Sequence, residues 1–144
     1  MGQTAFFLHL NLVGIIKIKE FKVPWTYSQA TGQLHHNGVL AGTGYSGAGL
    51  NTNSGRNNPA MQHVPNQGPI PSGEYQIGSS FNHAQKGPTS MNLSPIGHNA
   101  LGRSAFMIHG NNVQNSASHG CIILGPAIRQ QIANSGDNVL VVQQ

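Results

Sequence analysis

The only cysteine of the chain, Cys121, lies in the run Ser118-His119-Gly120-Cys121, and His109 precedes it by twelve positions. A thiol with imidazoles close in sequence is suited to nucleophilic catalysis, because the thiolate attacks and a histidine can take the thiol proton. Mechanisms based on paired carboxylates have few candidates, since the sequence contains only three acidic residues. The residue types therefore predict covalent chemistry at Cys121.

Three histidines could act as the base, namely His109, His119 and the more distant His98, and we favour His109. His109 ends an apolar segment, and a strand, a loop and a returning strand can bring its ring to the sulfur. The backbone N–H groups of Gly120 and Cys121 are predicted to form an oxyanion hole, and Ser118 to brace the turn.

The group that orients the imidazole is not evident from the sequence. No acidic residue lies near His109, so a backbone carbonyl or one of the two asparagines Asn111 and Asn112 has to do it. Two other interpretations of the cysteine stay open at this point. One is a buried core residue, since Ile122-Ile123-Leu124 follows it, and the other is a His/Cys metal site.

The elements that must position these residues are mostly short strands. Nineteen glycines and eight prolines favour many turns, and Pro126–Asn134 is the one segment with a clear helical pattern. The predicted strands are Trp25–Gln29, Leu34–Leu40, Glu74–Ile77, Met91–Leu93, Ala105–Ile108, Ile122–Leu124 and Val139–Val142. The loop-rich segment 41–73 is expected to be folded, because apolar residues recur in it. These patterns predict a mostly β fold with one or two short helices.

Composition limits the function classes. The net charge is +4, but the seven Lys and Arg residues are scattered and aromatic content is 6%, so nucleic acid is not expected as a partner. No apolar run is long enough to predict a transmembrane segment, and no convincing signal peptide is present. We expect a catalytic domain over residues 24–144 and an N-terminal extension of uncertain role over residues 1–23.

The segment from His109 to Leu124 resembles the signature of the L,D-transpeptidase (YkuD-type) catalytic domain, in which a histidine and a short spacer precede Ser/Thr-His-Gly-Cys. Further motifs resemble the L,D-transpeptidase-like effectors of type VI secretion. These motifs are Trp25-Thr26-Tyr27, Gly44-Tyr45-Ser46-Gly47, Asn57-Asn58-Pro59, Gly68-Pro69-Ile70-Pro71, Gly102-Arg103 with Phe106, and Ile108-His109-Gly110. The resemblance runs from about Trp25 to the C-terminus.

The resemblance implies an L,D-transpeptidase-like β-sandwich or barrel that acts on the tetrapeptide stems of peptidoglycan. Cys121 would be the nucleophile and His109 the base, with Ser118, His119 and Gly120 forming the turn. Ile123 stands where an arginine often follows the cysteine in this family, so Tyr45, Arg103 and Arg129 become the candidates for substrate binding. No cofactor and no metal are implied.

The effector branch further implies delivery by type VI secretion into the periplasm of a target cell. The implied partners are the stem peptides, an immunity protein and a component of the secretion apparatus. Two alternatives stay open: a housekeeping cell-wall L,D-transpeptidase, and a peptidoglycan-binding module without catalysis.

Overall fold

The computed structural model describes residues 4–10 and 16–144, and the surroundings of side chains from residue 23 onward. The chain is mostly β with one α-helix and three short 3-10 helices, which confirms the predicted fold class. The strands are β1 (Thr4–Leu10), β2 (Ile16–Lys22), β3 (Trp25–Ser28), β4 (Gln33–His36), β5 (Val39–Thr43), β6 (Tyr45–Ser46), β7 (Gly73–Ile77), β8 (Phe81–His83), β9 (Gly87–Ile96), β10 (Phe106–His109), β11 (Ile122–Ile123) and β12 (Val139–Gln143). The helices are η1 (Thr52–Ser54), η2 (Pro59–Met61), η3 (Ala100–Gly102) and α1 (Pro126–Ser135).

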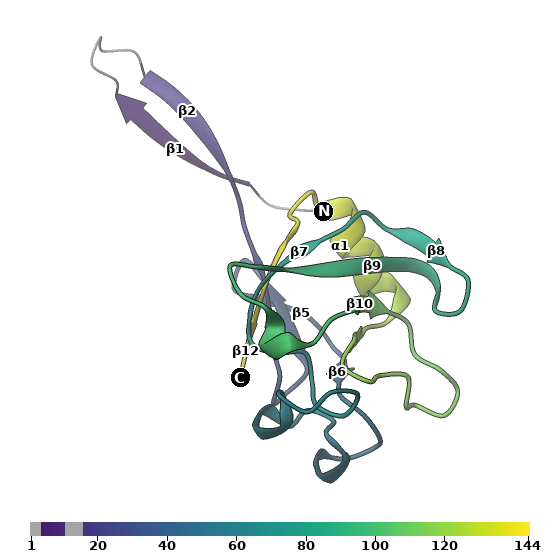
Figure 1. The fold of residues 1–144 in the computed structure, drawn as a ribbon. Helices are drawn as coiled ribbons and strands as arrows, with labels where there is room; N and C mark the ends of the chain where they lie inside the picture. The colour runs from purple at the N-terminus through teal and green to yellow at the C-terminus, as the bar shows by residue number, and fades with distance from the viewer. Residues whose placement is uncertain (1–3, 11–15) are drawn as a thin grey trace.

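Most of the strands form one nearly closed, barrel-like sheet (Figure 1). Its strand order is β5-β4-β3-β12-β7-β9-β10-β11-β6, with β8 paired to β9. The two ends of this order, β5 and β6, are separated in the chain by Gly44 alone. A Cβ at Gly44 would lie 1.8 Å from the Ile123 carbonyl oxygen, so this close passage of chain over β11 requires glycine.

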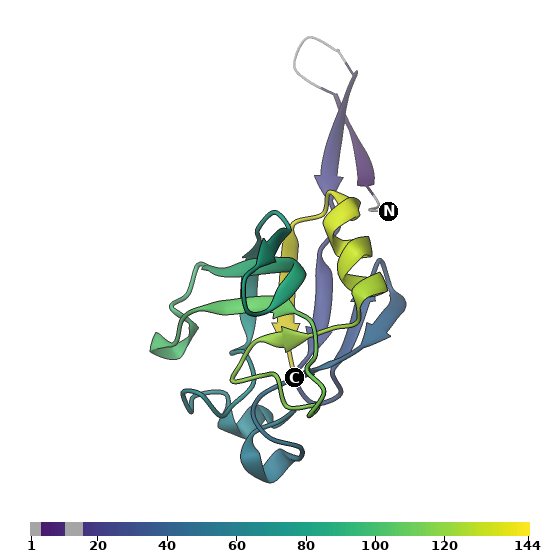
Figure 2. The same ribbon diagram turned by 90° about the vertical axis from the view of Figure 1, so that its right-hand side faces the viewer.

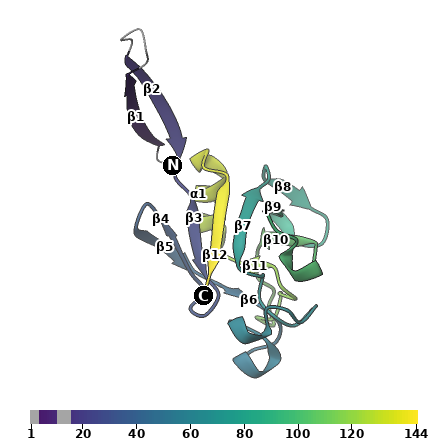
Figure 3. The ribbon, with the colours of Figure 1, turned by 60° about the vertical axis from the view of Figure 1, so that its left-hand side comes forward.

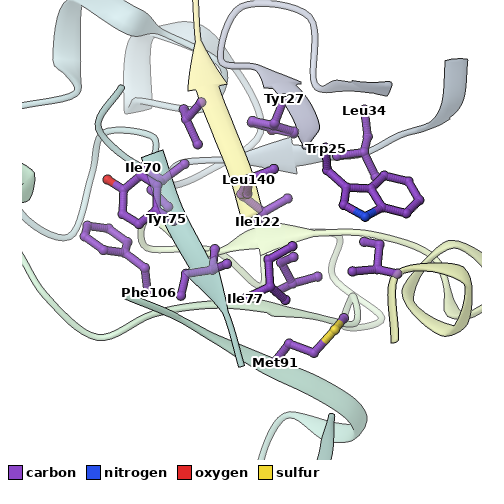
Figure 4. Close-up of a cluster of buried hydrophobic side chains, with 14 of the residues drawn as sticks. Trp25, Tyr27, Leu34, Ile70, Tyr75, Ile77, Met91, Phe106, Ile122 and Leu140 are labelled. Carbon is purple, nitrogen blue, oxygen red and sulfur yellow. The ribbon is translucent and has the colours of Figure 1, made fainter. Parts of the chain in front are cut away.

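The hydrophobic core lies inside this sheet (Figure 4). Tyr27, Tyr75, Ile122 and Leu140 come from four different strands and have no exposed surface. Neighbouring strands alternate buried and more exposed positions, as in β3 and β7, which is the period-two pattern of a half-buried sheet. Ile108 and Ile122 both belong to this core. The core therefore anchors β10, which ends with His109, and β11, which directly follows Cys121.

Helix α1 packs along the sheet beside β9 (Figure 2). The sequence predicted this helix over 126–134, and the structure confirms it. Pro126 occupies its first turn and Gly136, with φ of 73°, ends it in the left-handed conformation. Two residues of the helix, Arg129 and Ile132, are buried. The helix thereby places one arginine in the interior of the domain.

The predicted returning strand Leu34–Leu40 is wrong in one respect. Asn37 and Gly38 both have positive φ, and they separate β4 from β5 by a tight turn. An Asn-Gly pair is the commonest sequence for a two-residue hairpin, because both residues tolerate positive φ. Strand β8 was not predicted either, although it forms an antiparallel hairpin with β9.

The segment 41–73 is folded, as predicted, and contains β6, η1 and η2. Asn51 and Asn58 accept hydrogen bonds from backbone N–H groups at the starts of η1 and η2. Local side-chain capping thus replaces regular sheet pairing over much of this segment.

The N-terminal strands β1 and β2 form a separate antiparallel hairpin that projects from the main sheet (Figure 1). Residues 1–3 and 11–15 of the predicted 1–23 extension lie outside the described residues. In the part of the chain that the structure describes, no helix has the length and apolar character needed to cross a membrane.

Candidate active site

Cys121 lies immediately before β11, and His109 is the last residue of β10. The two strands are parallel neighbours, with Ile108 opposite Ile122 (Figure 3). Cys121 precedes Ile122 by one position, and His109 follows Ile108 by one position. In this register His109 lies opposite Ile123, two positions along the chain from Cys121, so the fold places the two residues diagonally on neighbouring strands although they are twelve positions apart in sequence.

The thiol of Cys121 is partly exposed and lies against the start of β10. Its sulfur donates a long hydrogen bond of 3.8 Å to the carbonyl of Ala105 and faces the backbone N–H of Met107. Ala105 has a φ of 66°, which is uncommon for a residue with a side chain. The sulfur therefore lies where β10 and β11 begin, and one long hydrogen bond holds its proton.

His109 is 1% exposed, and its two ring nitrogens differ in their surroundings. Nδ1 lies 2.8 Å from the carbonyl oxygen of Gly110. Because a carbonyl can only accept, Nδ1 must carry the proton of the neutral ring, and Nε2 then has a free lone pair. Among the described residues Nε2 has no hydrogen-bond partner, which is rare for a buried polar atom.

The electrostatics of the two groups favour their neutral forms. Burial raises the pKa of the Cys121 thiol above its ordinary value, while the Met107 N–H and the charges of Lys86 and Arg103 act to lower it. Burial lowers the pKa of His109, and the Gly110 hydrogen bond opposes this. The charges of Lys86 and Arg129 lower the pKa of His109 further. The resting pair is thus a thiol and a neutral imidazole.

Ser118 organises the turn that carries Cys121. Its buried hydroxyl accepts hydrogen bonds from the backbone N–H groups of Gly47 (2.9 Å) and Gly120 (3.0 Å). The same hydroxyl donates to the carbonyl of Cys121 at 2.6 Å. Gly120 has a φ of 139°, and an added Cβ would lie 2.6 Å from the guanidinium of Arg103. The turn therefore needs both the hydroxyl and the glycine.

Ser118→Ala is expected to lower the free energy of unfolding by about 2–5 kcal/mol, because two N–H groups and one carbonyl lose their partner. Urea denaturation followed by circular dichroism measures this change. Ser80→Ala, at an exposed serine, is the control and should leave the midpoint unchanged within error. An unchanged midpoint for Ser118→Ala would contradict the bracing role.

A cleft of about 300 Å³ opens beside the cysteine, and its walls include Arg103, Phe106, His119 and Cys121. Arg103 is nearly buried and donates to four carbonyls: those of Gln62, Gly68, Pro69 and His119. This guanidinium ties the 62–69 segment to the turn before the nucleophile. His119 is exposed, and its ring nitrogen lies 3.4 Å from the carbonyl of Asn66.

Tyr45 and Arg129 line a different cleft, of about 310 Å³. The Tyr45 hydroxyl donates to the Asn111 side chain at 2.6 Å and accepts from the Ala117 N–H at 2.8 Å. Arg129 donates to the carbonyls of Leu124 and Pro88 at 2.9 and 2.6 Å. Both side chains thus fix the loops that flank His109 and Cys121.

Three features of the site were not identified from the sequence. Ser46 is fully buried, donates to the Gly120 carbonyl at 2.9 Å and accepts from the Ile70 N–H at 2.8 Å. The second is Gly110, whose carbonyl orients His109; the sequence left a backbone carbonyl open for this role but did not say which one. The third is Lys86, at the tip of the β8–β9 hairpin. Ser46 and Lys86 have no local sequence signal, since segments far apart in the chain bring them to the site, whereas Gly110 directly follows His109.

Within residues 23–144, whose side chains the structure describes, no three His, Cys, Asp or Glu side chains are grouped as ligands for a metal ion. Cys121 lines the cleft of about 300 Å³, whereas His109 lines a smaller cleft of about 130 Å³ together with Lys86 and Gly110. A thiol and an imidazole oriented by a backbone carbonyl are the groups that acyl transfer through a cysteine uses.

The family model of the Tlde1 domain matches residues 41–143, more than two thirds of the chain. A comparison with curated protein sequences finds no match.

Two solved structures are similar to this one. The first is the L,D-transpeptidase LdtMt1 in complex with imipenem, with a TM-score of 0.47 and 14% identity over 88% of this chain and 62% of the other. The second is L,D-transpeptidase 1 of Mycobacterium tuberculosis, with a TM-score of 0.45 and 17% identity over 89% of this chain and 67% of the other. The chain thus spans less than two thirds of the first of these proteins.

Proposed function

The chain belongs to the Tlde1 domain family, a family of type VI secretion effectors, and on this premise we propose that it is a cysteine-dependent enzyme acting on peptidoglycan. Its reaction is acyl transfer from tetrapeptide stems, ending in hydrolysis or in exchange of the terminal D-alanine. The observation that carries the proposal is the state of His109. Its Nδ1–H is fixed by the Gly110 carbonyl, and its Nε2 is buried without a hydrogen-bond partner among the described residues, on the strand that pairs with β11 directly after Cys121.

The first step is attack on the carbonyl of the third stem residue. Nε2 of His109 takes the thiol proton, and the sulfur forms a bond to the carbonyl carbon. Because the pKa of the thiol is raised and that of His109 is lowered, the proton moves only as attack proceeds. His109 therefore activates the thiol by general-base catalysis within the enzyme–substrate complex.

The oxyanion that forms next needs hydrogen-bond donors. The Gly120 N–H already donates to Ser118, so we assign the oxyanion contact to the Cys121 N–H, with glycine at 120 leaving room for the oxygen. Collapse of the tetrahedral intermediate breaks the C–N bond, and the imidazolium of His109 gives its proton to the leaving amine. A thioester on Cys121 and free D-alanine result.

The thioester is then consumed by water or by an amine. Water gives a tripeptide stem, which is carboxypeptidase action; a free D-amino acid or another stem gives exchange or cross-linking. In each case His109 takes a proton from the acceptor, and the thiol is restored. Tyr45, Arg103 and Arg129 support this chemistry as positioning residues, because their polar groups hold the surrounding loops.

The biological setting follows from the family. We propose delivery by type VI secretion and action in the periplasm of a target cell, with an immunity protein protecting the producer. The scattered positive charge of the chain suits an anionic wall polymer. Residues 1–23, which include the β1–β2 hairpin, form an extension outside the catalytic domain.

The experiment that tests the function uses purified disaccharide-tetrapeptides. Incubation with the protein should release D-alanine and leave tripeptide stems, both detected by mass spectrometry. With an added D-amino acid, a second product should carry that residue in place of D-alanine. Unchanged tetrapeptides, together with binding of the protein to purified sacculi, would instead favour a wall-binding module.

A further inference from the structure

The structure describes the side-chain surroundings of four cationic residues, and only one of them has an unengaged charge. The three arginines donate to backbone carbonyls: Arg103 and Arg129 as given above, and Arg56 to Asn115 at 2.8 Å while it stacks on Tyr45. The ammonium of Lys86 makes no hydrogen bond or ion pair within this described part. A half-buried, unpaired cation is a site for an anion that the protein itself does not supply.

Lys86 is held in place by its own hairpin. The ring of His83 accepts hydrogen bonds from the N–H groups of Gln85 and Lys86, both at 3.0 Å, which closes the turn between β8 and β9. Two residues beyond Lys86, the carbonyl of Pro88 accepts from Arg129 at 2.6 Å. The guanidinium of Arg129 also lies against Gly110, where a Cβ would come within 2.9 Å of it. The hairpin tip is thereby fixed to the loop that orients His109.

The same hairpin tip forms one wall of a small cleft at His109. This cleft is about 130 Å³ and is lined by Lys86, His109, Gly110 and Asn112, among others. Pockets for larger ligands measure about 300–1,000 Å³. The cleft therefore suits one small residue, whereas the 300 Å³ cleft at Cys121 suits the longer acyl part of a substrate.

The chemistry of acyl transfer decides which part of the substrate meets Lys86. His109 donates a proton to the leaving amine, so the leaving residue must lie on the His109 side of the scissile bond. In a D-alanine leaving group the carboxylate is one carbon away from that amine. This anion therefore falls beside His109, where the unpaired ammonium is.

We propose that Lys86 binds the terminal carboxylate of the leaving residue and so restricts the enzyme to peptides with a free C-terminus at that position. The inference rests on the proposed function and adds its specificity-determining residue. The same contact orients a free D-amino acid as acceptor. Its amine attacks the thioester, gives a proton to His109, and the C–S bond breaks to restore the thiol.

The test compares two acyl donors that differ only in charge: a tetrapeptide ending in D-alanine and the same peptide ending in D-alanine amide. Wild-type protein should cleave the acid with a kcat/KM about 10- to 100-fold above that for the amide, the range expected of a charge-assisted hydrogen bond. Lys86→Ala should lower kcat/KM for the acid by a similar factor and leave the amide unchanged. The preference for the acid then disappears.

Two control variants separate charge from structure. Lys86→Arg keeps the charge and should keep the preference for the acid, whereas Asn82→Ala, at an exposed position of the same hairpin outside the cleft, should change neither rate. Alkylation of Cys121 by iodoacetamide shows that the nucleophile is intact in each variant. A Lys86→Ala protein that keeps the wild-type ratio of acid to amide would overturn the inference and leave the function standing. Failure of the wild-type protein on both peptides would instead overturn the proposed function.

Discussion

Cys121→Ala is expected to abolish release of D-alanine, with a loss of at least about 10⁴-fold in kcat, as for removal of a covalent nucleophile. No neighbouring group can replace the sulfur, because the Ser118 hydroxyl is buried and donates to the Cys121 carbonyl. The fold should survive, since the thiol is partly exposed and its one donated bond is 3.8 Å long. The free energy of unfolding should change by less than about 1 kcal/mol.

The measurement is mass spectrometry of muropeptides after a long incubation, with urea denaturation on the same preparation. Ser104→Ala is the matched control, because Ser104 is exposed and lines the same cleft. It should retain activity within about twofold. Release of D-alanine by folded Cys121→Ala would show that the sulfur is not the nucleophile.

His109→Gln is expected to lower kcat/KM by about 10²–10⁴-fold, which is the usual contribution of a general base. The loss follows from the raised pKa of the thiol, because without the imidazole very little thiolate is present at neutral pH. The variant also changes the pH profile. In the wild type, activity should fall only when the pH drops below about 6.5, since burial lowers the pKa of His109 from that ordinary value.

The direction of this pH dependence follows from which protonation state of His109 is active. Neutral His109 accepts the thiol proton, and a lowered pKa keeps it neutral to lower pH, so the acidic limb of kcat/KM moves down. His109→Gln should lack this limb and show a rate that rises steadily with pH as the thiolate forms. Alkylation of Cys121 at high pH should be the same in both proteins, which controls for an intact nucleophile. An unaltered acidic limb in His109→Gln would assign the base to another residue.

Local sequence was sufficient for some elements and not for others. The helix at Pro126–Ser135 was predictable because Pro126, the Ile128/Ile132 spacing and Gly136 all act within a few residues. The strand β10 was predictable from its apolar run. The split between β4 and β5 followed from Asn37-Gly38 and was missed, although its cause is also local. Strand β8 carries no apolar pattern, so only its pairing with β9 defines it.

The candidate nucleophile and base could be named from residue types, because only one residue in the chain is a thiol and few histidines lie near it. Their spacing in sequence did not say how they meet. The parallel pairing of β10 with β11 places the two residues on neighbouring strands, and it depends on Ile108 and Ile122 entering a core built by distant strands.

The sequence by itself determined which atoms can react and the mostly β class of the fold, since both depend on residue type and short-range pattern. Only the tertiary structure decided what surrounds Cys121. The Gly110 carbonyl orients His109, Ser46 and Ser118 hold the turn, and Arg103 and Arg129 serve backbone carbonyls rather than standing free. It also placed Lys86 at the His109 cleft. The physical reason is that a hydrogen bond or an unpaired charge depends on position in space, and partners such as Ser46 with Gly120 or Arg103 with Pro69 are far apart in the chain.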